Sequence, residues 1–449
     1  MKNLLVLLIL FVSILVNAQK TQLTDEEKIY GLSLIWQEVN YNFAYLENYN
    51  LDWDSVYTAN IPKVVAAKNL TEYYAILSGI INSFHEGHTT VILPIEIHKM
   101  YGYVPISLSY INGKYYVTTY SSEYKDKISI GSILKSVNGY DVDDYYDKFV
   151  FPNNNLAEHF AKRQSGKGRF FVGLLNEKLT ATFINSDGKT VSLKPKRIPY
   201  YTSGPETIKV PKMYKDTVFL HKKYGDISYI RINSFLNSIA STSFAKIVDS
   251  LKSSKAIIFD VRANVGGDSQ YATDIISYFS DKKTMPLWWG QQKVNRGFSK
   301  AVGVYTYLYG DSLAKANNYY ADYVTLSHYE GGQYSYPNNT NGELKDIPVI
   351  VLCNYLTISS AEAFILQLKQ VTSVTVIGEP TAGSSTMALE VQLPGGGRFK
   401  IATVLALDEN GKPYKYTQPD IIHIPSLEDE KTGNDSVLKI AIDLINNEN

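Results

Sequence analysis

The sequence predicts an α/β protein in three parts: a helical N-terminal subdomain, a small β module and an α/β core. Three patterns lead to this prediction. From Thr24 to Phe84 the apolar residues recur with a helical period, whereas between about residues 100 and 195 they alternate as in half-buried strands. From about residue 225 apolar strand-like runs alternate with helical segments. The 449 residues are enough for about three structural units.

The composition is that of a globular protein without a strong charge. Hydrophobic residues make up 45% of the chain and charged residues 20%, so the composition does not indicate disorder or a fibrous repeat. Lys plus Arg number 44, and Asp plus Glu also number 44. This balance gives no electrostatic reason to expect a nucleic acid or an anionic membrane surface as a partner.

The N-terminus has the pattern of a secretory signal peptide. Lys2 precedes an apolar run that ends at Val16, and the small residue Ala18 provides a cleavage site, so residues 1–18 are predicted to be a signal peptide. No later apolar stretch is long enough to span a bilayer, and no membrane anchor is expected after cleavage. The single cysteine, Cys353, lies in an apolar run and is predicted to be a buried core thiol. A periplasmic or secreted location is expected.

Changes of pattern along the sequence indicate the boundaries of the expected structural units. Residues 19–95 form the helical N-terminal subdomain, which leads into a Pro94 boundary. Residues 96–200 form the β module, with a turn at Asn112-Gly113. The stretch from Gly131 to Gly139 resembles a strand and turn of PDZ domains, so this PDZ-like module either holds a peptide at a sheet edge or braces the core.

Residues 201–449 form the α/β core. Its strands are predicted at 227–232, 256–261, 349–353 and 374–378, and its helices at 244–251, 271–279, 361–370 and 436–445. This alternation indicates a largely parallel sheet with crossover helices. Residues 281–345 are rich in Gly, Asn and Tyr and have weak periodicity, which predicts an insertion over the surface.

Three segments follow strands of this predicted sheet, where α/β proteins bind ligands. The first ends in Gly266-Gly267, whose backbone N–H groups could approach an anion, although a plain glycine turn explains it as well. The second carries Ser359 at a helix start, where Ser359 and Glu362 could simply form a capping box. The third contains Ser384 and would reach the same edge.

Taken together and in this order, the three segments resemble the superfamily of tail-specific and tricorn-like serine proteases. The resemblance implies an α/β core of the tail-specific protease (crotonase-like) type. It also implies that Ser359 is the nucleophile and that backbone N–H groups of Gly266 or Gly267, and of Ser360, form an oxyanion hole. The adjacent Ser360 is the lesser candidate for the nucleophile.

The sequence departs from the family at the general base. The tail-specific branch has a lysine where this chain has Ser384, and a neutral hydroxyl cannot replace it. The tricorn-like branch uses a histidine near the end of the N-terminal helical region, and that position here is His88. An ordinary histidine pKa of about 6.5 suits a general base, and predicts an acidic limb of the pH profile between about 6 and 7.

The group that orients this histidine is left open by the sequence. Asp420, Glu409 and Asp408 are candidate acids near the C-terminus, and Ser384 could orient the ring instead. A metal site at His85 and His88 is the alternative, but two histidines three apart without a third ligand do not match the zinc protease motif. No cofactor and no metal are therefore expected.

The expected function is that of an exported serine peptidase acting on peptides or unfolded protein segments, with Ser359 as nucleophile and His88 as base. The alternative is a non-catalytic protein that binds a peptide or a lipophilic ligand on the same fold. The sequence predicts neither the natural substrate nor the oligomeric state.

Overall fold

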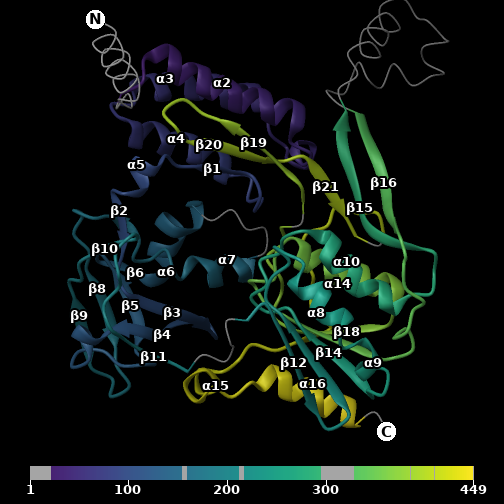
Figure 1. The fold of residues 1–449 in the computed structure, drawn as a ribbon. Helices are drawn as coiled ribbons and strands as arrows, with labels where there is room; N and C mark the ends of the chain where they lie inside the picture. The colour runs from purple at the N-terminus through teal and green to yellow at the C-terminus, as the bar shows by residue number, and fades with distance from the viewer. Residues whose placement is uncertain are drawn as a thin grey trace, which may run out of the picture.

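A computed structural model describes residues 22–153, 159–211, 217–294, 328–384, 386–408 and 410–447 of the chain. A helical region, a β-rich region and an α/β core lie around a common centre (Figure 1). The predicted signal peptide, residues 1–18, lies outside the described residues. Among the described helices none is both long and apolar enough to cross a bilayer.

The helical N-terminal region packs three amphipathic helices around an apolar core. Its helices are α2 (Asp25–Asn42), α3 (Trp53–Ala66), α4 (Leu70–Asn82) and the short α5 (Ile95–His98), with a 3-10 turn at Leu46–Asn48 and strand β1 (Thr90–Ile92). Helix α2 begins at Thr24, which forms a capping box with Glu27. The helical period predicted between Thr24 and Phe84 is thereby confirmed.

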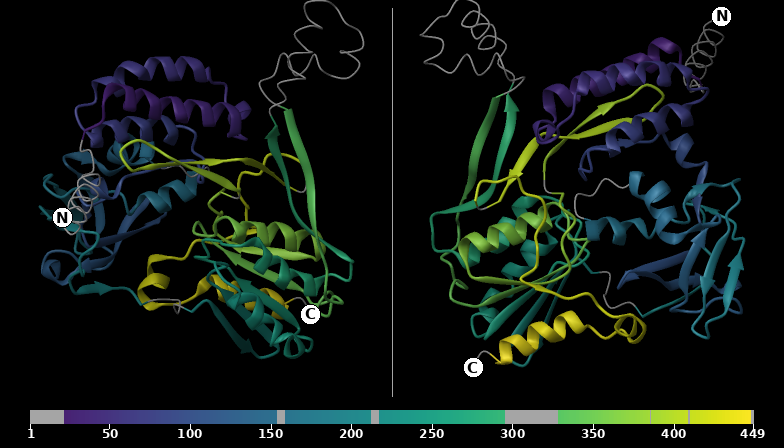
Figure 2. Two further views of the ribbon diagram at one scale, coloured as in Figure 1. Left: turned by 45° about the horizontal axis from the view of Figure 1, so that its top comes forward. Right: turned by 180° about the vertical axis from the view of Figure 1, so that it is seen from behind.

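A hairpin from the C-terminal third of the chain completes this core. Strands β19 (Ala388–Gln392) and β20 (Arg398–Ala402) pair with each other, and β20 also pairs antiparallel with β1. Phe399 and Ile401 are fully buried among the residues of α2 and α4. Both views of Figure 2 show the hairpin lying against the helices. The sequence boundaries at 19–95 and 201–449 assign these strands to a different unit from the core that they fill.

The β-rich region contains two small sheets. Its strands are β2 (Tyr101–Tyr103), β3 (Ile106–Ile111), β4 (Lys114–Ser121), β5 (Ile133–Val137), β6 (Tyr140–Asp141), β7 (Gly173–Leu174), β8 (Ala181–Ile184), β9 (Thr190–Leu193), β10 (Ile198–Pro199) and β11 (Thr207–Lys209). Helices α6 (Val142–Tyr145) and α7 (His159–Gly166) accompany them, with a π-helical turn (Tyr146–Val150) and 3-10 turns (Ser122–Tyr124, Phe151–Asn153). The predicted turn at Asn112-Gly113 joins β3 to β4 with positive φ at both residues. The likeness to PDZ domains stays a prediction.

The α/β core is built on one six-stranded sheet. The strand order is β12 (Phe219–Tyr224), β13 (Ile227–Ile232), β14 (Ala256–Asp260), β17 (Val349–Cys353), β18 (Val374–Gly378) and β22 (Ile421–Ile422). All neighbouring pairs from β13 to β22 are parallel, and β12 is antiparallel to β13. The predicted parallel sheet is therefore confirmed.

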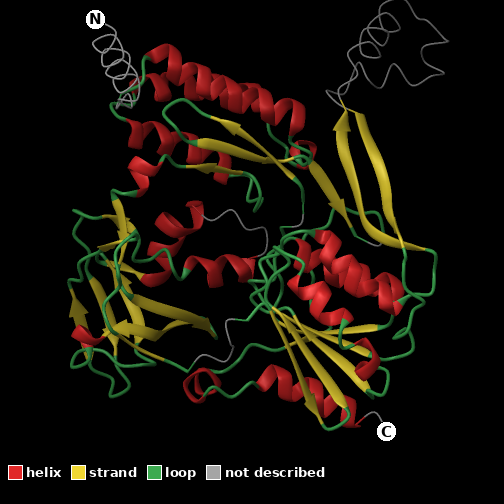
Figure 3. Cartoon of the chain, viewed as in Figure 1, coloured by secondary structure: helices red, strands yellow, loops and turns green. Residues whose placement is uncertain are grey.

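Helices cover both faces of this sheet (Figure 3). One face packs against α8 (Ile239–Ala245), α9 (Val248–Leu251), α10 (Ser269–Ile276), the 3-10 turn Ser277–Phe279 and α14 (Ser360–Val371). The other face packs against α16 (Ser436–Asn447), which follows α15 (Leu427–Thr432). Cys353 is a buried free thiol, as expected.

The predicted insertion begins and ends in a long hairpin. Strands β15 (Thr284–Val294) and β16 (His328–Pro337) pair antiparallel, and β21 (Val404–Leu407) pairs with β15. The residues between 294 and 328 lie outside the described part of the chain. The hairpin stands beside α10 and α14 (Figure 1).

Candidate active site

Ser359 lies at a strained turn between strand β17 and helix α14. Its backbone has φ 60° and ψ −124°, a region that non-glycine residues rarely adopt, and α14 begins at the next residue. Its N–H donates to the carbonyl of Ser384 at 2.7 Å. The dipole of α14 favours negative charge at this end of the helix.

The glycine segment after β14 lies directly against this turn. A Cβ atom on Gly266 would come within 2.8 Å of the Ser359 Cβ and 2.9 Å of the Ser360 nitrogen, so only glycine permits this approach. The Gly266 N–H is engaged, because it donates to Asn264 Oδ1 at 2.9 Å. Gly267 is exposed and lines the cavity in front of Ser359, which makes it the better placed of the two glycines as an oxyanion donor.

The end of β14 that carries this segment is fixed by a buried ionic network. The Asp260 carboxylate is fully buried and accepts hydrogen bonds from Arg231, Arg262 and Tyr229. Burial opposes ionisation of Asp260, but Arg262 and Arg231 hold its pKa below the ordinary value. Arg262 also pairs with Asp435 at 2.7 Å, which ties this strand end to the start of α16.

The Ser360 hydroxyl is committed to the backbone. It is nearly buried, donates to the Gly267 carbonyl at 2.6 Å and lies 3.1 Å from the Ser269 hydroxyl. These contacts hold the glycine loop against α14. They do not suit a hydroxyl that must attack a substrate, whereas the backbone nitrogen of Ser360 lies close to Gly266.

His88 and Ser384, which lie 296 residues apart in the sequence, are in direct contact. The Ser384 hydroxyl lies 2.5 Å from Nδ1 of the His88 ring. Because the Ser384 carbonyl accepts the Ser359 N–H, the same residue touches both the histidine and the serine turn. Ser384 thus links the residues that the sequence singled out as nucleophile and base, by a backbone hydrogen bond to Ser359 and a side-chain contact with His88.

The surroundings of His88 keep its ring neutral. Burial, together with the positive charge of Lys400 on β20, lowers the pKa of His88 to about 4. This value lies below the ordinary histidine pKa of about 6.5 on which the expected acidic limb was based. At neutral pH the imidazole therefore retains the lone pair that a general base needs.

Glu86, which lies between the two histidines considered as a metal site, is an acid close to the His88 ring. Its buried carboxylate accepts hydrogen bonds from the backbone N–H of His88 at 3.0 Å and from the Thr89 hydroxyl at 2.5 Å. One carboxylate oxygen lies 3.9 Å from His88 Nδ1, which is too long for a hydrogen bond. Burial raises the pKa of Glu86. Its contacts fix the backbone that carries the histidine.

Glu362 is the second acid whose role the sequence analysis understated. Its carboxylate is completely buried and accepts from five donors: the Thr381 hydroxyl (2.5 Å), the Tyr414 hydroxyl (3.0 Å) and the N–H groups of Gly383 (2.9 Å), Ser384 (2.8 Å) and Ser359 (3.3 Å). Burial raises its pKa. Glu362 therefore does more than cap α14, because it joins the turn of Ser359 to the segment of Ser384.

The remaining candidate acids have other surroundings. Asp420 accepts from the Val376 N–H at 2.8 Å and lies 3.9 Å from Lys369, so it secures β22 against β18. Asp408 accepts from backbone groups of its own turn. Glu409 lies outside the described residues. Among the described contacts of Asp420 and Asp408, none is with His88.

The two histidines of the considered metal motif face different neighbours. The His85 ring packs 5.2 Å from the Phe151 ring, centroid to centroid, whereas His88 contacts Ser384. In the part of the chain that the structure describes, no group of three or more His, Cys, Asp or Glu side chains is arranged to hold a metal ion.

A cavity of about 490 Å³ opens in front of Ser359. Helix α10 with the glycine loop, helix α14 and strand β16 contribute to its wall, together with the segment before β19; its lining includes Gly267, Ser269, Tyr336, Ser359 and Met387. The lining is mixed in polarity, and the cavity is wide enough for part of a peptide.

The chain is similar to known peptidases in sequence and in fold. The model of peptidase family S41 matches residues 226–423. The carboxy-terminal processing protease CtpA of Bacillus subtilis (strain 168) is 25% identical over 228 residues, which cover 48% of this chain and 41% of that protein. The match thus spans less than half of the length of this relative.

Two solved structures share the fold over nearly the whole chain. Mature CPAF is similar with a TM-score of 0.69 and 17% identity, covering 94% of this chain and 98% of the other. A putative peptidase from Parabacteroides merdae ATCC 43184 has a TM-score of 0.53 and 18% identity, covering 94% and 97%.

The fold and the matched segment are similar to those of the serine-type peptidases that include the tail-specific proteases. Residues 226–423 match the model of peptidase family S41, which confirms the resemblance found in the sequence.

Proposed function

We propose that this protein is an exported serine peptidase that hydrolyses peptide bonds in peptides or unfolded protein segments. The observation that carries the proposal is the junction at Ser384, whose carbonyl holds the Ser359 turn while its hydroxyl contacts the His88 ring. A strained serine at a helix start, linked through Ser384 to a neutral histidine, supplies the nucleophile and the base that nucleophilic catalysis requires.

In the proposed reaction His88 has the tautomer in which Nδ1–H donates to the Ser384 hydroxyl, so that Nε2 keeps a lone pair. The Ser359 Oγ attacks the peptide carbonyl and its proton passes to Nε2. The tetrahedral intermediate collapses when His88 returns that proton to the leaving amine. Water then attacks the acyl-enzyme with the same histidine as base, which releases the acid and restores the Ser359 hydroxyl.

The oxyanion of the intermediate would be held by backbone N–H groups. The Ser360 N–H lies at the first turn of α14, and the Gly267 N–H belongs to the loop that closes against it. Such donors are oriented before the reaction begins, and each contributes about 3 kcal/mol to transition-state stabilisation in comparable sites.

Export is proposed from the leader-like sequence of residues 1–18, which would deliver the mature chain to the periplasm or the medium. A peptide or protein chain is the proposed substrate, and the cavity in front of Ser359 would receive it.

Covalent labelling with a fluorophosphonate tests the proposal directly. The wild-type protein should be labelled at Ser359 and S359A should not. S360A should still be labelled, because its hydroxyl only braces the glycine loop. Labelling that disappears in S360A alone would move the nucleophile by one residue. A folded wild-type protein that neither reacts nor cleaves peptides would favour the binding-protein alternative.

A further inference from the structure

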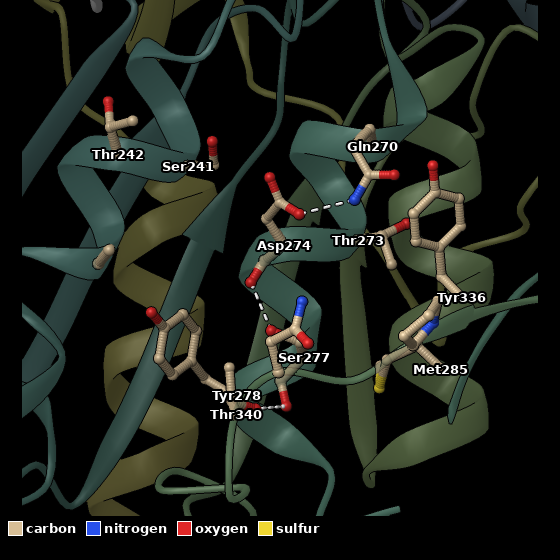
Figure 4. Close-up of a pocket in the computed structure, with 13 residues that line it drawn as sticks. Ser241, Thr242, Gln270, Thr273, Asp274, Ser277, Tyr278, Met285, Tyr336 and Thr340 are labelled. Carbon is tan, nitrogen blue, oxygen red and sulfur yellow. Dashed lines mark hydrogen bonds between the residues drawn. The ribbon is translucent and has the colours of Figure 1, made fainter. Parts of the chain in front are cut away.

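A second cavity lies beside the one that contains Ser359. It has a volume of about 390 Å³ and lies between helices α8 and α10 on one side and the end of strand β16 on the other (Figure 4). Gln270 and Tyr336 line both cavities. A peptide chain bound across Ser359 could therefore place a side chain in this second cavity.

The lining of the second cavity is rich in hydrogen-bond acceptors and has one carboxylate. Asp274 points into it from α10, and the other polar groups are hydroxyls and amides, including Ser241, Thr273 and Thr340. None of the described residues that line it is Lys, Arg or His. A cation entering this cavity would meet negative charge and no competing cation.

Two details show that the acceptors are fixed before any ligand arrives. The Gln270 amide donates to Asp274 Oδ1 at 2.7 Å, which leaves the second carboxylate oxygen available. The amide oxygen of Gln270 is buried and has no hydrogen-bond partner among the described residues. A buried acceptor without a donor is costly, and an incoming N–H group would satisfy it.

The electrostatic surroundings favour the same ligand. Burial raises the pKa of Tyr278, which lines the cavity, and the nearby carboxylates of Glu343 and Asp274 raise it further. The potential in this region is therefore negative, as a site for a protonated amine or guanidinium requires.

We infer that this cavity is a specificity subsite that takes a lysine or arginine side chain of the peptide substrate, bound by Asp274 and Gln270. The inference rests on the proposed peptidase function, because the cavity adjoins the serine. A site with preformed acceptors rejects side chains that leave those acceptors unpaired, so the preference for a basic over an isosteric apolar residue should be about tenfold or more in kcat/KM.

The first experiment profiles cleavage of a mixture of short synthetic peptides of varied sequence by mass spectrometry. The wild-type protein should show Lys and Arg enriched at one fixed position relative to the cleaved bond. D274N, which keeps the acceptor for Gln270 but removes the charge, should lose most of this enrichment. D249N is the matched control, because Asp249 is an exposed carboxylate on α9 that pairs with Lys252 and lines neither cavity.

Two results of this experiment would overturn the inference: cleavage without enrichment of basic residues, or enrichment that D274N retains. The second experiment needs no catalysis. It measures binding of fluorescent Ala-Gly peptides, with one lysine moved along the chain, to S359A and to S359A/D274N. Peptides with norleucine in place of lysine are the reference.

At least one lysine peptide should bind S359A several-fold more tightly than its norleucine counterpart, and S359A/D274N should remove the difference. Equal binding of all lysine and norleucine peptides would overturn the subsite. If the wild-type protein cleaves nothing but this lysine preference is present, the peptidase proposal fails while the basic subsite stands.

Discussion

Replacement of Glu362 by glutamine tests whether this buried acid organises the site or only caps a helix. A glutamine side chain keeps one acceptor oxygen and replaces the other by a donor. The least costly orientation keeps the oxygen that faces Thr381, Gly383 and Tyr414. The N–H groups of Ser384 and Ser359 then lose their acceptor.

The expected loss of stability follows from those two contacts. A hydrogen bond to a charged group contributes about 1.5 to 3 kcal/mol, and the long contact of the Ser359 N–H contributes least. Removing a buried charge offsets part of the loss. We therefore expect E362Q to lower the free energy of unfolding by about 3 kcal/mol, which leaves the protein folded under mild conditions.

The expected effect on catalysis is a lower kcat with little change in KM. Since the Ser384 N–H would no longer be held, the hydroxyl that contacts His88 would be poorly positioned, and kcat should fall by about 10- to 100-fold. Urea unfolding and steady-state hydrolysis of a peptide substrate measure the two effects. The matched control is E27Q, because Glu27 has the same position in the capping box of α2.

Two outcomes would refute this reasoning. If E362Q and E27Q lose the same small amount of stability, Glu362 acts only as a cap. If folded E362Q has the kcat of the wild-type protein, the link between Glu362 and Ser384 has no role in catalysis.

Three further predictions follow from neighbouring groups. S384A should lower kcat by about tenfold or more with KM little changed, and S384T should restore much of it; an unchanged kcat in S384A would show that the hydroxyl does not orient His88. Because the pKa of His88 is lowered to about 4, kcat/KM should stay high down to about pH 5. K400M removes a positive charge that lowers this pKa, so it should move the acidic limb of the pH profile to higher pH. An acidic limb near pH 6.5 in the wild-type protein would contradict this prediction. Burial raises the pKa of Glu379 from 4.5 to about 7, so its ionisation lowers the free energy of unfolding as the pH rises through this range, by about 3 kcal/mol in total. E379Q should remove that part of the pH dependence. Thermal melts at pH 5 and pH 8 measure it, and a change in melting temperature between the two pH values that is the same in E379Q and the wild type would refute the prediction.

The core strands could be predicted because their sequences are rich in apolar and β-branched residues, and 349–353 is a continuous apolar run. The runs at 227–232 and 349–353 are buried on both faces of the sheet, so the pattern of the sequence records their position. Strand β12 has no such pattern, because it is an edge strand whose second half, Lys222 to Tyr224, is exposed. The pairing of β20 with β1 depends on residues more than 300 positions apart and leaves no local signal.

The candidate site was predictable where a motif lies within one segment. The turn of Ser359 and the glycines after β14 each have a local pattern that marks a strand end. Contacts between segments have none, so the sequence could list Ser384 as an orienting group but could not place it on the His88 ring. Glu86 and Glu362 had weaker signals, an acid two residues before the histidine and an acid three residues after the serine, which ordinary caps and turns also produce.

The hairpin of β19 and β20 has a consequence for the biogenesis of the protein. Phe399 and Ile401 fill the N-terminal core, and the Ala402 N–H donates to the Thr89 hydroxyl, next to His88. A nascent chain emerging from a ribosome cannot complete these contacts until residue 402 has been made. The surroundings of His88 can therefore be completed only after residues 89–402 have been made. The proposed catalytic base cannot be in its final position before that point of synthesis, so the proposed peptidase activity needs no separate inhibitor until then.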